Sequence, residues 1–249
     1  MNDFDILSKD NVINSVYPLV YWIKNEYISE YSPNDFILGG RGTAFLYKTG
    51  QYKYLVTLRH NYDDSSTFGI VNAMKNCLLH KEFSSLNRVS FRDLDKNNLI
   101  RMEYLPLGLI EEYADLCFFR ITANSPKDEY FLEYQFPKEH TLDKGYVIGY
   151  PQDHKKLGEE YYHCSRAALA VSIDTISEYD KTMFYHYQEE EDLDLNGFSG
   201  GPLMQYNTDS DSFIFTSMVM SGTGGRIRAI PASVIEEILR EYEEIIFRR

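Results

Sequence analysis

Cysteine is scarce in this chain and offers no framework for disulfides or metal sites. Only three cysteines occur, Cys77, Cys117 and Cys164. They are odd in number and widely scattered, with no CxxC pair and no Cys/His spacing of the kind that binds zinc. We therefore expect reduced thiols and no metal. Cys117 lies inside the apolar run 116-LCFF-119, which indicates a buried small hydrophobic residue.

Basic residues are also few, since 25 Lys and Arg stand against 38 Asp and Glu and give a formal net charge of -13. Binding to a phosphate backbone requires clustered basic side chains that displace counterions, and no such cluster is present. The 21 tyrosines are not interleaved with basic residues, as a stacking platform for bases would require. The composition argues against nucleic acid as the main partner and favours basic partners or substrates.

Long apolar runs are missing as well. No segment reaches transmembrane length, and the stretch 1-MNDFDILSKD-10 lacks the basic and continuously apolar regions of a secretory signal. We expect a cytoplasmic protein that does not bind membranes. Hydrophobic residues still make up 43% of the chain, which is ample for a substantial buried core.

Short strand-like runs separated by turn residues make up most of the chain. The run 14-NSVYPLVYW-22 could be a strand or a short helix, and Pro18 is tolerated in an edge strand. In 42-GTAFLYKTGQYKYLVTLRHN-61, two β-rich runs flank a turn and predict a hairpin that delivers His60 to a strand end. Later, Asp115 opens another apolar run. The pattern predicts an all-β barrel or sandwich.

One helix is expected at the end of the chain. Over residues 231–249, apolar residues from Val234 to Ile246 recur on one helical face. Ser233 and Glu236 have the spacing of a capping box.

The stretch 195-LNGFSGGPLM-204 has the residues of an acyl-transfer site. Acyl transfer by serine needs an activated hydroxyl, a base, a carboxylate that orients the base, and donors aimed at the developing oxyanion. The hydroxyl would be that of Ser199. The backbone amides of Gly197 and Ser199 would converge on one oxyanion if the loop curls tightly, and glycine at 197 accepts the positive φ that this needs.

Three segments, in this order, resemble a chymotrypsin-fold (trypsin-like) serine peptidase, closer to the intracellular and Deg-type branch. They are the run from Gly42 through 56-VTLR-59 to His60, the triplet Ala114-Asp115-Leu116, and the motif from Gly197 to Pro202. The resemblance implies an all-β fold of two packed six-stranded antiparallel β-barrels with a C-terminal α-helix. We expect the N-terminal barrel within residues 1–125 and the C-terminal barrel and helix within 126–249.

The same resemblance implies a catalytic triad of His60, Asp115 and Ser199, with no cofactor. His60 would act as general base and then general acid, and Asp115 would fix its tautomer. Gly197 and Ser199 would form the oxyanion hole. The function implied is a serine endopeptidase that cleaves protein or peptide substrates through an acyl-enzyme.

The substrate pocket is less clearly indicated. The family's pocket is floored six residues before the nucleophile, here by Leu193, with Asp194 beside it. Leu193 favours an apolar substrate side chain, whereas an inward-pointing Asp194 would favour Lys or Arg; Asp194 could equally continue the solvated acidic run before it. Ser221 and Gly222 are expected in one pocket wall, where a substrate strand could pair.

Phe198 departs from the family, whose members carry Asp or Asn before the nucleophile. We expect its ring to pack beneath the loop. Activation by a freed N-terminal amine, which needs that Asp, is then not expected, and a latent enzyme activated by a partner protein would fit a cytosolic location. The alternative function is a binding module with a protease fold and no turnover. An esterase or another acyl transferase would use the same residues.

Overall fold

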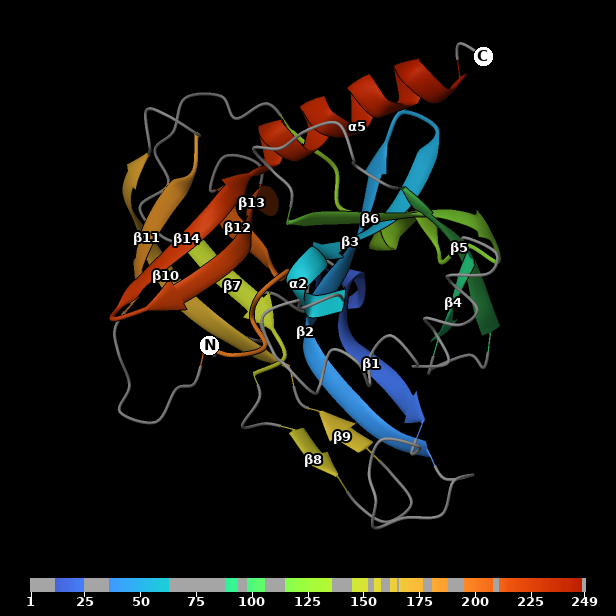
Figure 1. Ribbon diagram of the computed structural model, residues 1–249. Helices are drawn as coiled ribbons and strands as arrows, with labels where there is room; N and C mark the ends of the chain where they lie inside the picture. Colours follow the sequence, from blue (N-terminus) through green and yellow to red (C-terminus); the bar gives the residue numbers. More distant parts are fainter. Residues whose placement is uncertain are drawn as a thin grey trace.

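The computed structural model describes residues 12–24, 36–62, 88–93, 98–105, 115–135, 145–151, 155–157, 162–164, 166–176, 181–187, 195–207 and 211–247. Within these residues the chain forms two six-stranded antiparallel β units, one short hairpin and a long C-terminal helix (Figure 1). The predicted chymotrypsin-like arrangement of two packed β units and a helix is confirmed.

The first unit, called here the N-terminal sheet, has the strand order β1-β2-β3-β6-β5-β4. Its strands are β1 (Val16–Lys24), β2 (Phe36–Thr49), β3 (Tyr52–Leu58), β4 (Arg88–Asp93), β5 (Asn98–Leu105) and β6 (Leu116–Ala123). A single 3-10 turn, η1 (Val12–Ser15), precedes β1, which is an edge strand and so tolerates Pro18. Between β2 and β3 lies the predicted hairpin turn, where Gly50 has a φ of 53°.

The second unit, called here the C-terminal barrel, closes on itself in the order β10-β11-β14-β13-β12-β7. Its strands are β7 (Gly145–Gly149), β10 (Ala167–Ile176), β11 (Met183–Tyr187), β12 (Pro202–Asn207), β13 (Ser212–Thr223) and β14 (Arg226–Pro231). A separate hairpin is formed by β8 (Lys155–Leu157) and β9 (Tyr162–Cys164). The sequence did not reveal β12 or β14, which directly follow the glycine motif and a Gly-Gly turn.

Aromatic side chains from both units meet in one shared core. The Phe215 ring of the C-terminal barrel lies 5.0 Å from the ring of Phe45 and 5.7 Å from that of Tyr47, both on β2. The segment after β6, which includes the 3-10 turn η4 (Asp128–Tyr130), then links the units: Leu132 bridges to Tyr47, and Tyr134 bridges to Phe215. The boundary between residues 125 and 126 stays a prediction.

The C-terminal helix α5 (Ala232–Phe247) lies across both units (Figure 1). The predicted apolar face is buried at Val234, Ile235, Ile238 and Leu239, whereas Ile245 is 54% exposed. The predicted capping box is wrong, because the helix begins at Ala232 and places Ser233 inside its first turn.

Glu236 is instead drawn into the boundary between α5 and the N-terminal sheet. Its carboxylate accepts hydrogen bonds from Tyr47 Oη at 2.6 Å, Thr49 Oγ1 at 2.9 Å and Arg240 Nε at 2.6 Å. About two turns further along the helix, the Glu243 carboxylate accepts a hydrogen bond from Tyr54 Oη at 2.6 Å. Burial raises the pKa of both tyrosine hydroxyls far above the usual range, and these bonds to carboxylates raise it further.

No helix within the described stretches is long and apolar enough to cross a membrane.

Candidate active site

Strand pairing brings His60 and Asp115 to the same place. β3 and β6 are antiparallel neighbours in which Leu58 lies opposite Leu116. The residues just after β3 and just before β6 therefore emerge at the same end of the sheet. After Leu58 the chain turns at once into a four-residue helix, α2 (Arg59–Tyr62), which carries His60, while Asp115 lies in the turn that enters β6.

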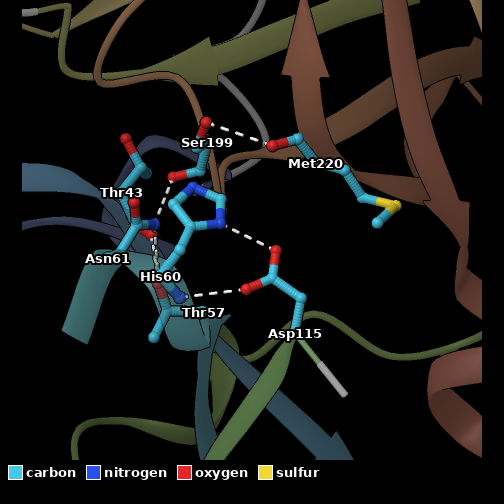
Figure 2. Close-up of polar contacts among 7 residues, drawn as sticks. All are labelled: Thr43, Thr57, His60, Asn61, Asp115, Ser199 and Met220. Atoms are coloured by element: carbon cyan, nitrogen blue, oxygen red, sulfur yellow. Dashed lines mark hydrogen bonds and ion pairs between the residues drawn. The ribbon is translucent and has the colours of Figure 1, made fainter. Parts of the chain in front are cut away.

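Asp115 holds His60 by both of its carboxylate oxygens (Figure 2). Oδ1 accepts a hydrogen bond from the His60 backbone N–H at 2.9 Å, and Oδ2 lies 2.7 Å from His60 Nδ1. The two side chains are 34% and 32% exposed, so the pair stays open to solvent on one side. Because Nδ1 donates to the carboxylate, Nε2 is left as the basic nitrogen of the neutral ring.

The loop that carries Ser199 is fixed by a series of backbone hydrogen bonds. Phe198 N–H donates to Leu195 O at 3.1 Å, Gly200 N–H to Val219 O at 2.8 Å, and Gly201 N–H to Phe198 O at 2.7 Å. Gly197 has a φ of 101°, the positive value that the sequence analysis anticipated for a tight curl.

The amides of Gly197 and Ser199 are the predicted oxyanion donors. Neither N–H donates to another group in the described part of the chain. Since a peptide group is planar, the bond from Gly201 to the Phe198 carbonyl turns the Ser199 N–H of that peptide to the opposite side. An amide fixed in this way needs no reorganisation to bind an oxyanion.

The Ser199 hydroxyl points away from His60 (Figure 2). It donates to the carbonyl oxygen of Met220 at 3.2 Å, and within the described residues no hydrogen bond joins it to the His60 ring. Met220 lies where the β13–β14 register shifts between Val219 and Ser221. Bulges of this kind re-aim backbone groups, which accounts for a strand carbonyl that faces the serine.

The predicted pocket residues fall into two groups. Leu193 and Asp194 lie outside the described residues. Ser221 and Gly222 lie near the end of β13, and a Cβ at Gly222 would come 2.4 Å from Leu195 Cδ1. Gly222 therefore packs against the side chain that opens the nucleophile loop, two residues after the predicted pocket floor at Leu193.

The prediction that Phe198 packs beneath the loop is confirmed. Its side chain is 1% exposed and belongs to the apolar core of the C-terminal barrel, with Val147, Leu203 and Val219 among its neighbours. A Cβ at Gly149 would lie 2.7 Å from the Phe198 ring, so the glycine makes room for it.

Sequence reasoning missed Thr43 and Asn61, which connect the N-terminal sheet to the nucleophile loop. Thr43 donates to Gly197 O through its hydroxyl at 2.6 Å and to Ser199 O through its backbone N–H at 2.9 Å. Asn61, next to His60, donates from Nδ2 to Ser199 O at 2.7 Å. The only sequence signal was their position, directly after Gly42 and directly after His60.

Other nucleophiles and metal ligands are not assembled in the described part of the chain. Cys117 is fully buried as predicted, and burial raises the pKa of its thiol well above the usual value, so it stays protonated. No group of three or more His, Cys, Asp or Glu residues in these stretches could hold a metal ion.

A solved structure shares this arrangement of two β units. The HtrA-type protease AlgW, solved with a decapeptide, superposes with a TM-score of 0.57 at 12% identity, over 99% of this chain and 68% of that one. The chain has the chymotrypsin-like fold. At this low identity, the similarity establishes nothing beyond the fold.

Two structures of an M. tuberculosis protease, Rv3671c, both inactive forms, align less well. They give TM-scores of 0.49 at 12% and 13% identity, cover 96% of this chain, and are covered over 92% and 91% of their own length. No family model matches the chain, and no curated protein sequence matches it.

Proposed function

We propose that the chain is a trypsin-like serine endopeptidase with His60, Asp115 and Ser199 as its catalytic triad. The observation that carries this proposal is the grip of Asp115 on both the backbone N–H and Nδ1 of His60, at 2.9 Å and 2.7 Å. A carboxylate bound in this way fixes the ring and its tautomer, as a general base requires. The bond from Asn61 to the Ser199 carbonyl brings the nucleophile next to that base.

In this proposal, His60 Nε2 takes the Ser199 proton as Oγ attacks the substrate carbonyl carbon. The carbonyl oxygen becomes an oxyanion that accepts hydrogen bonds from the amides of Gly197 and Ser199. His60 then gives its proton to the leaving amine as the C–N bond breaks. Water, deprotonated by His60, hydrolyses the acyl-enzyme and restores Ser199.

The resting serine must turn before it can react. Its hydroxyl is bound to Met220 O, so a rotation about χ1 has to bring Oγ from that carbonyl to His60 Nε2. Active sites often tighten such contacts only once substrate is bound. We propose that an extended peptide pairs along β13 near Ser221 and Gly222, beside a pocket that includes Leu193 and Asp194. The same resting contact is compatible with latency relieved by a partner protein.

One observation favours the alternative, a protease-fold binding module without turnover. The Ser199 hydroxyl is bonded to Met220 rather than to the base. If that contact is permanent, the cleft can bind a peptide but cannot acylate.

Labelling with a fluorophosphonate separates the two functions. The probe phosphonylates only a serine whose proton is removed by a base. We expect wild-type protein to be modified at Ser199, as located by mass spectrometry, and both Ser199→Ala and His60→Ala to remain unmodified. Asp115→Asn should label about 10⁴-fold more slowly, because an amide stabilises the wrong tautomer.

If the folded wild-type protein is not labelled after purification, the labelling is repeated in cell lysate. Labelling that appears only in cell lysate would identify a latent enzyme, whereas absence of labelling in both settings would support the binding module and overturn the proposed function.

A further inference from the structure

Thr43 on β2 and Asn61 on α2 hold the nucleophile loop by its backbone carbonyls. Thr43 Oγ1 binds Gly197 O at 2.6 Å, while Thr43 N–H and Asn61 Nδ2 both bind Ser199 O, at 2.9 Å and 2.7 Å (Figure 2 for Asn61). Thr43 is completely buried and Asn61 is 1% exposed. We propose that Thr43 and Asn61 are positioning residues that keep the loop in the conformation required for acyl transfer. This inference rests on the proposed function.

The grip on the carbonyls fixes the peptide planes that directly follow the two predicted oxyanion amides, those of Gly197 and Ser199. A peptide group turns as one rigid plane. The plane between Gly197 and Phe198 is held at both ends, by Thr43 Oγ1 on its carbonyl and by Leu195 O on its N–H. Withdrawal of the oxyanion loop by rotation of this plane would break both bonds.

The plane that follows Ser199 is held in the same way. Its carbonyl accepts from Thr43 N–H and Asn61 Nδ2, and its N–H, on Gly200, donates to Val219 O at 2.8 Å. Ser199 therefore has a fixed peptide after it, and the bond from Gly201 to Phe198 O fixes the peptide before it. Its Cα and its N–H are held in place, whereas its hydroxyl can leave Met220 O by rotation about χ1.

Two glycines make this approach possible. Gly42, with a φ of 73°, leaves a space in which a Cβ would lie 2.2 Å from Asn61 Cγ, so the Asn61 amide occupies the place of a side chain. At Gly200, with a φ of 83°, a Cβ would lie 2.2 Å from Thr43 O. The chain lacks side chains at the two points where they would separate Thr43 and Asn61 from the loop.

The contacts form one network. Thr57 Oγ1 donates to Thr43 O at 2.7 Å and accepts from Asn61 Nδ2 at 3.2 Å, which joins the two positioning residues. Thr43 Oγ1 also accepts from Tyr150 N–H at 3.0 Å, from just beyond β7. The hydrogen bonds described for these groups run to the loop and to one another, so we expect them to act on kcat through geometry and to leave the pH dependence of the base unchanged.

The test uses Thr43→Val, which removes the hydroxyl and preserves the shape and the backbone N–H. A peptide substrate that the wild-type protein cleaves provides the kinetic readout. We expect kcat to fall about ten- to hundredfold with little change in KM. The Gly197 carbonyl loses its donor, and the loop that this bond holds is proposed to stabilise the transition state rather than the bound substrate. Thr43→Ser, which restores the hydroxyl, should recover most of the loss. Asn61→Asp, which replaces the donor by an acceptor, should be at least as damaging as Thr43→Val.

Thr49→Val is the matched control. Thr49 is a buried threonine on the same strand whose hydroxyl donates to Glu236, far from the loop. It loses a comparable hydrogen bond, so it should lose stability without the fall in kcat. Equal kcat in Thr43→Val and Thr49→Val would overturn the inference.

A second readout does not depend on catalysis. Amide hydrogen exchange, followed by mass spectrometry of peptides that cover residues 195–203, should be faster in Thr43→Val than in Thr49→Val. A wild-type protein that is labelled neither when purified nor in cell lysate would refute the proposed function, yet the exchange comparison would still test the grip on the loop. Equal exchange in the two variants would refute the positioning role whatever the activity.

Discussion

Replacing Gly200 by alanine should separate the two β units at the nucleophile loop. The added Cβ would lie 2.2 Å from Thr43 O, 2.7 Å from Thr57 Oγ1 and 3.0 Å from Asn61 Nδ2. The nearest of these atoms belongs to the backbone and cannot swing away. Restoring ordinary contact would require a displacement of roughly 1 Å between the loop and β2.

The expected effects have two causes, the backbone strain of alanine at a positive φ and the steric clash of its Cβ with β2. A non-glycine residue at positive φ costs about 1–2 kcal/mol, and forced overpacking adds about 1–3 kcal/mol. A shift of roughly 1 Å at a catalytic centre can reduce the rate about 100-fold. We expect Gly200→Ala to lose both stability, measured by urea denaturation, and the rate of fluorophosphonate labelling at Ser199.

Gly50→Ala separates the backbone strain from the steric clash. Gly50 also has a positive φ, of 53°, but nothing lies within 4 Å of its absent Cβ. Gly50→Ala should lose only the unfolding free energy that corresponds to backbone strain, and it should keep the wild-type labelling rate. If Gly200→Ala is no less stable than Gly50→Ala and labels as fast as wild type, the close approach of the loop to β2 is not what positions Ser199.

Three further changes test the packing around the site. Phe198→Ala should lose about 3–5 kcal/mol of unfolding free energy in urea denaturation; a loss no larger than that of an exposed residue would refute burial beneath the loop. Glu236→Ala strands two buried hydroxyl donors on β2 and should cost about 2–4 kcal/mol, whereas Glu236→Gln, which keeps an acceptor, should cost less; equal losses would contradict these hydrogen bonds. Above pH 10, the folded protein keeps the Tyr54 proton that the unfolded chain releases, so unfolding free energy should fall with rising pH. Tyr54→Phe should reduce that slope by about 1.4 kcal/mol per pH unit, and an unchanged slope would show that the Tyr54 pKa is not raised by its burial and its bond to Glu243.

Local turn chemistry made the positions of His60 and Asp115 predictable. The hairpin turn at Gly50 and the change from polar to apolar residues at Asp115 are both visible in the sequence, and antiparallel pairing of β3 with β6 then brings the strand ends together. A strand end that continues as a short helix, as at α2, leaves no comparable signal. The prediction of a strand end for His60 was therefore close to the outcome but lacked that helical turn.

Contacts between the two units could not be read from the sequence. Glu236 has the spacing of a capping residue, but the helix begins at Ala232, and the Glu236 carboxylate accepts hydrogen bonds from three donors on β2 and α5 instead. Thr43 resembles any β-branched strand residue, and its role depends on a carbonyl 154 positions away. The Met220 carbonyl that faces Ser199 lies at a register shift, which is specified by the pairing of β13 with β14.

Within the described residues, the contacts around Phe198 order this loop by apolar packing and by hydrogen bonds between neutral groups. Its ring is buried in the C-terminal barrel, its own carbonyl is bound by Gly201, and the carbonyls of Gly197 and Ser199 are bound by Thr43 and Asn61. These interactions join neutral groups, so they are little affected by ionic strength, whereas a loop held by an exposed charge pair weakens as salt screens it. The labelling rate of Ser199 should therefore stay nearly constant from low salt to 1 M. A steep loss over that range would mean that an ion pair, and not the buried ring with its carbonyl contacts, orders the loop.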